Sequence, residues 1–218
     1  MAQLIRGLDA RRLAGNLARV REEIGRDDVQ ILAAVKYVAA EEMGVLAEAG
    51  VTLVGENRAQ DLEAKAVAWG GRADFTWDFI GHLQSRKVKQ ILPHVRWIHS
   101  VASDSALKEL GKHAAAGTEV LVEVNVARDE GKSGVLPEEL DGFLERVGRV
   151  GRDIHVVGLM TMPPFTERPE DSRRWFAALA QLAGERGLRE LSMGTSQDYA
   201  VAAQEGATIV RLGTSLYT

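Results

Sequence analysis

The stretch Val29–Tyr37 reads VQILAAVKY and places five consecutive apolar residues, Ile31 to Val35, directly before Lys36. A continuous apolar run of this kind is typical of a strand that is covered on both faces, as the strands of parallel sheets are. The lysine that follows is then the first charged side chain at the end of the strand.

Similar short apolar runs recur along the chain, and alanine-rich amphipathic stretches separate them. The predicted strands are 29–37, 51–54, 76–80, 96–101, 119–125, 154–160, 190–193 and 208–212. The predicted helices are 8–25, which precedes the first strand, and 41–49, 57–68, 85–91, 104–115, 137–149, 169–186 and 197–204. Strands that alternate with helices indicate a parallel sheet, because parallel neighbours need crossover connections.

Two closures of such a sheet compete, an open doubly wound sheet and a closed barrel. The count of eight predicted strands favours the barrel. The Gly-x-Gly-x-x-Gly fingerprint of a dinucleotide-binding first turn is missing, which counts against the open sheet. We therefore expect an α/β protein, a single-domain (β/α)8 TIM barrel over residues 1–218 with an extra N-terminal helix.

Composition narrows the possible functions. The chain contains no cysteine, which excludes disulfides, thiolate metal sites and a cysteine nucleophile. Its five histidines show no metal-ligand spacing. The net charge of −4 gives no general attraction for nucleic acid, and neither a signal peptide nor an apolar run of membrane-spanning length is present. We expect a cytoplasmic protein that binds neither nucleic acid nor membrane.

In a barrel the chemistry lies at the carboxyl ends of the strands. The residues that follow the apolar runs of this chain are mostly polar or glycine, which is the pattern of a site. They are Lys36, Glu56-Asn57, Gly81-His82, His99-Ser100, Asn125, Met160-Thr161, Gly194-Thr195-Ser196 and Gly213-Thr214.

Lys36 is the sharpest of these candidates. A lysine that is partly buried at a barrel mouth shifts its pKa readily, which suits Schiff-base chemistry. The competing interpretation is a lysine whose stem packs on the strand while its ammonium stays in water. Position alone does not decide between them.

Two loops late in the chain are candidates for binding phosphate. Ser192–Ser196 leads from the seventh strand toward a helix, with Ser196 predicted as its N-cap, and helix N-termini bind anions. Arg211–Thr214 closes the eighth strand with another glycine and hydroxyl, and barrels often bind phosphate after strands seven and eight. A plain capped turn is the alternative for each loop.

Two other features are weaker. His82 would lie over the barrel mouth after a tight turn at Gly81, although a lone histidine is more often structural. Gly131-Lys132-Ser133 is similar to the tail of a Walker A loop, but the earlier glycine of that motif falls at Val126. We expect 131–133 to be a surface loop.

The strand-end residues resemble those of a known family. Lys36 after Ala33-Ala34-Val35, the segment Phe79–Ser85 (FIGHLQS), Ser192-Met193-Gly194 and Arg211–Thr214 (RLGT) are similar to motifs of the pyridoxal-phosphate homeostasis proteins. The match spans nearly the whole chain in order. It implies the barrel of the alanine racemase N-terminal domain, with pyridoxal 5′-phosphate (PLP) held as an internal aldimine.

The resemblance also assigns roles to particular residues. These are Lys36 as the Schiff-base lysine, Ser196, Gly213 and Thr214 at the phosphate, Met193 and Gly194 in the phosphate loop, Arg211 at the pyridine nitrogen, Asn57 near the cofactor, and His82 and Met160 at the mouth.

The chain departs from the family pattern in three places. Tyr37 stands where a small hydroxyl residue often follows the lysine, and would either replace its contact or pack outward. Thr195 stands where many members have methionine. The sequence stops at Thr218, so the final helix is short or absent, or its role passes to the N-terminal helix.

Three functions compete. The first is a PLP carrier that supplies the cofactor to PLP-requiring apoenzymes without strong turnover, and the second is a PLP-dependent racemase or decarboxylase. The third is an unrelated sugar-phosphate enzyme. Racemisation needs proton donors on both faces of the cofactor, and Lys36 is the one obvious candidate. We expect the carrier, acting as a monomer.

Overall fold

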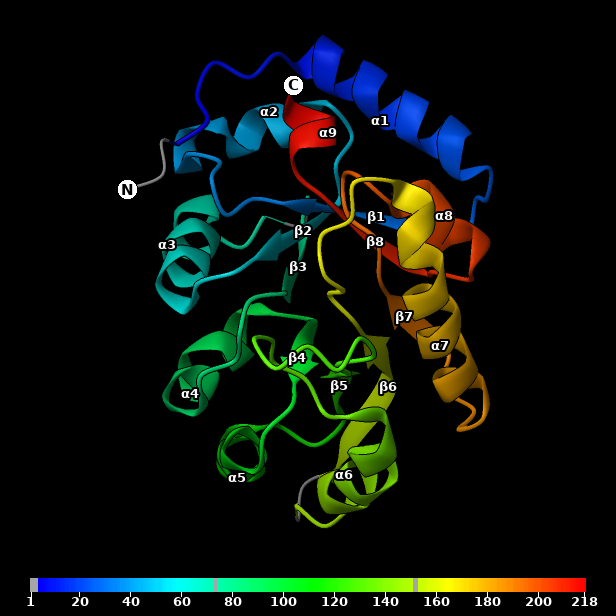
Figure 1. The fold of residues 1–218 in the computed structure, drawn as a ribbon. Helices are drawn as coiled ribbons and strands as arrows, with labels where there is room; N and C mark the ends of the chain where they lie inside the picture. Colours follow the sequence, from blue (N-terminus) through cyan, green and yellow to red (C-terminus); the bar gives the residue numbers. More distant parts are fainter. Residues whose placement is uncertain (1–3, 73, 151–152) are drawn as a thin grey trace.

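The computed structural model describes residues 4–72, 74–150 and 153–218. Parallel strands close into a barrel in which each strand pairs with its neighbours in sequence and β1 pairs with β8 (Figure 1). The strands are β1 (Gln30–Ala34), β2 (Leu53–Glu56), β3 (Thr76–Phe79), β4 (Trp97–Val101), β5 (Thr118–Glu123), β6 (Ile154–Met160), β7 (Glu190–Ser192) and β8 (Ile209–Leu212). The predicted barrel is confirmed.

Helices connect the strands around the outside of the barrel (Figure 1). The α-helices are α1 (Ala10–Ile24), α2 (Met43–Glu48), α3 (Ala59–Trp69), α4 (Val88–Ile91), α5 (Asp104–His113), α6 (Leu140–Gly148), α7 (Arg173–Gly184), α8 (Tyr199–Gln204) and α9 (Thr214–Tyr217). Short 3-10 turns are η1 (Ala40–Glu42), η2 (Ser85–Lys87), η3 (Leu92–His94), η4 (Pro137–Glu139) and η5 (Pro169–Ser172).

The two faces of the strands have separate partners. Apolar side chains that point inward form a cluster inside the barrel, namely Leu32, Leu53, Trp97, Leu121, Met160 and Ile209. Outward-facing neighbours such as Ala33 and Val54 belong to the larger core under the helices. Since each fully buried Leu or Ile stabilises the fold by about 1.5–3 kcal/mol, strands buried on both faces explain the continuous apolar runs.

The N-terminal helix α1 packs against the chain's C-terminal helices α8 and α9. Asp9 caps α1 by accepting a 2.7 Å hydrogen bond from the backbone N–H of Arg12. Asn16 Nδ2 then donates 3.0 Å hydrogen bonds to the carbonyl oxygens of Leu216 and Thr218. Because α9 has only four residues, the last position around the barrel is covered mainly by α1. Both the short final helix and the substitution by α1 were among the sequence expectations.

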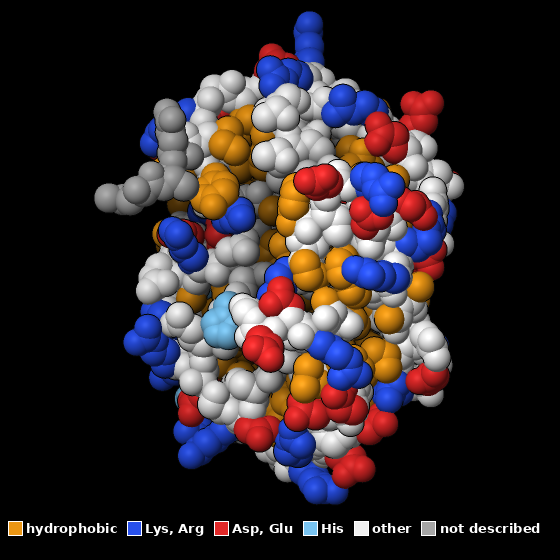
Figure 2. Space-filling model, in the orientation of Figure 1, with side chains coloured by type: hydrophobic (Ala, Val, Ile, Leu, Met, Phe, Trp, Pro, Cys, Tyr) orange, Lys and Arg blue, Asp and Glu red, His pale blue; other side chains and the backbone are white. Residues whose placement is uncertain are grey.

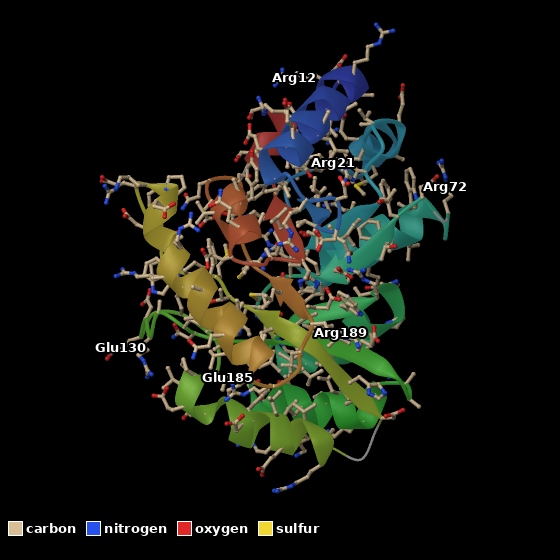
Figure 3. The ribbon with its side chains drawn as sticks, turned by 90° about the vertical axis from the view of Figure 1, so that its right-hand side faces the viewer. Arg12, Arg21, Arg72, Glu130, Glu185 and Arg189 are labelled. Atoms are coloured by element: carbon tan, nitrogen blue, oxygen red, sulfur yellow. The ribbon has the colours of Figure 1, made fainter. Side chains whose placement is uncertain are left out.

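Charges of both signs are interspersed over the face shown in Figure 2, with hydrophobic side chains visible between them. Arg12 and Arg21 of α1 lie at the surface (Figure 3). Across the described part of the chain, no helix combines the length and the apolar character that crossing a membrane requires.

Candidate ligand site at the mouth of the barrel

A cavity of about 730 Å³ opens at the carboxyl ends of the strands, a size typical of small-molecule sites. The predicted residues that line it are Lys36, Asn57, His82, Met160, Gly194, Ser196, Arg211, Gly213 and Thr214. Met193 stands apart, because its side chain is fully buried in the core below the loop. The structure thus brings together side chains from distant parts of the sequence.

Lys36 lies in a turn just beyond β1. The strand ends at Ala34, three residues before the predicted end at Tyr37. Beyond Ala34, the Val35 N–H still donates a 2.9 Å hydrogen bond to Gly55 O of the neighbouring strand. Ile5 N–H donates to Tyr37 O at 2.6 Å and so ties the N-terminal segment to this turn. The Lys36 ammonium lies 4.8 Å from the centroid of the Tyr37 ring. Tyr37 is 39% exposed and also lines the cavity.

A buried ion pair contacts the turn that holds Lys36. Lys65 Nζ on α3 lies 2.6 Å from Glu56 Oε2 at the end of β2, and both side chains are buried. The same ammonium donates a 2.6 Å hydrogen bond to the carbonyl oxygen of Val35. Sequence reasoning missed Lys65, although Ala59, Leu62 and Lys65 recur at a spacing of three on one helix face.

Asn57 follows β2 directly and lines the cavity. Its Oδ1 is buried without a hydrogen-bond partner among the described residues, and a buried unpaired acceptor costs about 1–3 kcal/mol. Gly81 allows the β3 loop to lie against Asn57, since a Cβ there would be 2.0 Å from Asn57 O. His82 follows at the rim of the cavity and is exposed.

The β7 and β8 loops are joined through Ser196. Its Oγ accepts hydrogen bonds from the backbone N–H groups of Gly213 (3.1 Å) and Ser215 (3.2 Å). The prediction that Ser196 caps the following helix was wrong, because α8 starts at Tyr199 with Asp198 at its N-cap position. Ser196 lies too early in the loop to reach that helix, and it fastens the next loop instead.

Gly194 is required at its position in the β7 loop. Its φ is +90°, and a Cβ there would approach Ala202 Cβ to 2.6 Å. A left-handed backbone favours glycine, and the close approach to α8 excludes any side chain. The loop can therefore pass between α8 and the cavity.

Arg211 lies on β8 and its guanidinium is buried while lining the cavity. Nη1 donates to Ser192 O at 2.7 Å and to Ser192 Oγ at 2.6 Å, and Nη2 donates to Thr161 O at 2.8 Å. Burial lowers the pKa of Arg211 to about 10, against the attraction of Glu123 and Asp198. The group remains a cation at neutral pH.

The segment 131–133 is a surface loop, as expected, and its residues Lys132 and Ser133 also line the cavity. Lys132 Nζ donates to the carbonyl oxygens of Met162 (2.9 Å) and Pro163 (2.6 Å), which joins the loops after β5 and β6. Ser133 Oγ donates to Glu123 Oε1 at 2.8 Å. Glu123 is a cavity residue that the sequence did not single out, and burial raises its pKa.

Comparison with known proteins agrees with this geometry. Residues 8–218 match the family model described as alanine racemase, N-terminal domain. A pyridoxal phosphate homeostasis protein of Aquifex aeolicus is 39% identical over 220 residues, covering 94% of this chain and 96% of the relative. The chain belongs to the family of pyridoxal phosphate homeostasis proteins.

Solved structures extend the family likeness. PipY of Synechococcus elongatus, solved with PLP bound, is a family relative that superposes with a TM-score of 0.82 at 30% identity and covers 94% of this chain and all of its own. Alanine racemase from Corynebacterium glutamicum superposes with a TM-score of 0.70 at 16% identity and covers 100% of this chain and 63% of its own. That second likeness shows the shared barrel alone.

Proposed function

We propose that the protein binds PLP through a Schiff base on Lys36 and serves intracellular PLP homeostasis, holding the cofactor and releasing it to apoenzymes. The observation that carries the proposal is that the Lys36 amine and the Ser196–Gly213–Thr214 cluster line one cavity. PipY, the relative with PLP bound, supports it. In this proposal the protein acts as a cytoplasmic monomer.

The residues present fit this cofactor. When bound, PLP supplies an aldehyde that condenses with a primary amine and releases water. Lys36 provides the amine, and Asn57 lines the same cavity. The hydroxyls of Ser196 and Thr214 provide donors suited to phosphate oxygens, and the Gly213 N–H holds the Ser196 oxygen in place by donating to it.

Arg211 favours a protein that holds the cofactor over one that turns over a substrate. A guanidinium that remains charged and faces the pyridine nitrogen opposes protonation of that nitrogen. An unprotonated ring is a weaker electron sink, which slows carbanion chemistry. Lys36 and Arg211 together therefore suit a carrier.

A PLP-dependent racemase or decarboxylase is the alternative. It is favoured by the barrel shared with alanine racemase and by Glu123, a buried carboxyl group that lines the same cavity and whose pKa is raised. Such a group can donate a proton. The alternative predicts turnover that depends on Glu123.

The two functions separate in one assay. PLP should bind with a visible absorption band and a dissociation constant near micromolar, which corresponds to about 8 kcal/mol. A panel of L- and D-amino acids at saturating PLP should then show no turnover at enzymatic rates. Turnover above about 1 per second that is lost in Glu123→Gln would support the alternative.

A further inference from the structure

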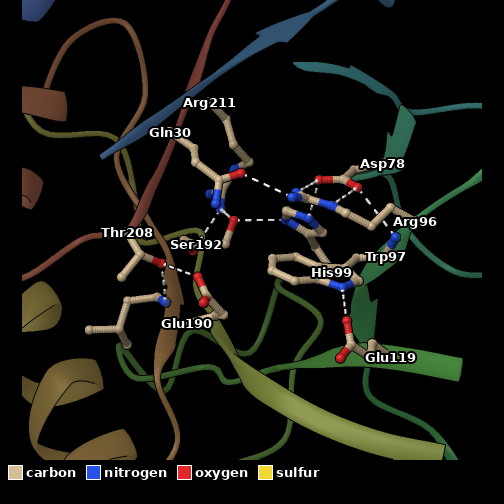
Figure 4. Close-up of polar contacts among 11 residues, drawn as sticks. Gln30, Asp78, Arg96, Trp97, His99, Glu119, Glu190, Ser192, Thr208 and Arg211 are labelled. Carbon is tan, nitrogen blue, oxygen red and sulfur yellow. Dashed lines mark hydrogen bonds and ion pairs between the residues drawn. The ribbon is translucent and has the colours of Figure 1, made fainter. Parts of the chain in front are cut away.

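A line of buried polar side chains crosses the barrel beneath Arg211 (Figure 4). Ser192 Oγ, which accepts from Arg211, lies 2.9 Å from His99 Nδ1. On the other side of the ring, His99 Nε2 lies 3.1 Å from Asp78 Oδ2. Asp78, His99 and Ser192 belong to β3, β4 and β7, respectively, and all three residues are fully buried.

The far end of the line is fixed by a second arginine. Arg96 holds both Asp78 oxygens, with Nη2 at 2.6 Å from Oδ2 and Nε at 3.1 Å from Oδ1. Its Nη1 donates to Gln30 Oε1 at 3.0 Å, at the first residue of β1 (Figure 4). A two-bonded pair of this kind is directional as well as strong. The Asp78 carboxylate therefore cannot turn freely.

The charge states of Asp78 and His99 decide which atom donates in each hydrogen bond between Asp78, His99 and Ser192. Burial works to raise the pKa of Asp78, but hydrogen bonds from His99 and Arg96 outweigh it and hold the pKa below its usual value. Burial lowers the pKa of His99, despite Asp78, so the ring is neutral at pH 7. An ionised carboxylate only accepts, so His99 Nε2 carries the proton and Nδ1 is an acceptor. Ser192 must then donate to Nδ1, which leaves its oxygen lone pairs facing Arg211.

We propose that Asp78, His99 and Ser192 are positioning residues that orient the Arg211 guanidinium toward the pyridine nitrogen of the bound cofactor. This rests on the proposed function, because it concerns the same cofactor. Without the Ser192 hydroxyl, Arg211 keeps two carbonyl acceptors, Ser192 O and Thr161 O. It also keeps the Met162 sulfur at 3.5 Å, and it loses the hydroxyl acceptor, whose direction is set by His99 and Asp78.

The test compares two hydroxyl deletions between β7 and β8. Ser192→Ala removes the contact with Arg211. Thr208→Val is the matched control, because Thr208 Oγ1 also joins these strands, accepting from Leu191 N at 2.9 Å and donating to Glu190 Oε2 at 2.7 Å, away from Arg211. Each protein is titrated with PLP and with an analogue in which a C–H replaces the ring nitrogen.

The ratio of the two dissociation constants reports recognition of the ring nitrogen, because a general disturbance of the site would weaken binding of both ligands alike. Ser192→Ala should change this ratio by about fivefold or more, as expected for a weakened charge-assisted contact, and Thr208→Val should leave it unchanged. An unchanged ratio in folded Ser192→Ala, or equal changes in both variants, overturns the proposal. Wild-type protein that binds neither ligand contradicts the proposed function instead.

A second measurement needs no cofactor. Nitrogen NMR of the wild-type protein at pH 7 should show His99 neutral with its proton on Nε2. On Ser192→Ala the Nδ1 resonance should shift, because its donor is gone. A proton on Nδ1, or a charged ring, would overturn the directional relay even if PLP binds as proposed.

Discussion

Lys65 Nζ donates a 2.6 Å hydrogen bond to the carbonyl oxygen of Val35, the residue immediately before Lys36. The same ammonium is paired with Glu56, whose Oε1 accepts from the N–H of Asn57 at 2.7 Å. One buried ion pair thus fixes the chain beside two residues of the cavity, Lys36 and Asn57. The pair connects the packing of α3 to the geometry of the site.

Lys65→Met should strongly destabilise the protein. The substitution leaves Glu56 buried and unpaired, and breaking a buried pair in this way costs about 3–5 kcal/mol. The free energy of unfolding, measured by denaturant titration, reports the loss. Arg149→Met is the control, since its pair with Glu145 is exposed and should contribute less than about 1 kcal/mol. Similar small losses in both variants would show that the Lys65 pair does not hold this turn.

The phosphate cluster makes a separate prediction. Ser196→Ala combined with Thr214→Val should weaken PLP binding by roughly 2–4 kcal/mol, at about 1–2 kcal/mol for each lost charge-assisted hydrogen bond. Pyridoxal, which lacks the phosphate, should bind both proteins almost equally. Parallel titrations of the two ligands measure the difference. Equal losses for PLP and pyridoxal would mean that the substitutions disturb the loops and do not remove phosphate contacts.

The buried His99 should lower the free energy of unfolding in mild acid. Burial lowers its pKa from the ordinary value of 6.5. Below about pH 6.5 the unfolded chain takes up a proton that the folded ring still refuses, so stability is complete above this pH and falls as the pH drops. The slope is at most about 1.4 kcal/mol per pH unit.

Unfolding measured between pH 8 and pH 5 in wild type and in His99→Gln tests this. The glutamine variant should be less stable at pH 8 but should lose less on acidification. Groups that His99 does not affect, such as Glu123, contribute equally to both curves and cancel in the difference. Parallel pH curves for the two proteins would contradict a neutral buried His99.

The sequence predicted the barrel because short, largely apolar runs such as Ile31–Val35 alternate with amphipathic stretches, and most residues of these runs are buried. It predicted most of the cavity because strand ends meet at one rim. Lys65 was missed because a charged residue on an amphipathic helix ordinarily faces water. Ser196 was misassigned since its partners, Gly213 and Ser215, lie on another loop that only the fold brings near.

The sequence did not predict the line of buried polar side chains beneath Arg211 either. His99 was noted as a strand-end residue, but nothing in one strand tells which groups face it across the barrel. Asp78 lies between Trp77 and Phe79, and an acidic residue within an apolar strand was an unused signal of a buried partner. The identity of that partner depends on the closure of the sheet.

The central claim is that Lys36 carries the cofactor. Borohydride reduction of the PLP-loaded protein, followed by peptide mapping, tests it directly. The account predicts a phosphopyridoxyl group on Lys36, with loss of the visible band in Lys36→Ala, which should remain folded because the Lys36 side chain is exposed at the rim of the cavity. A reduced adduct on another lysine, such as Lys132 in the same cavity, with Lys36 unmodified, would contradict it.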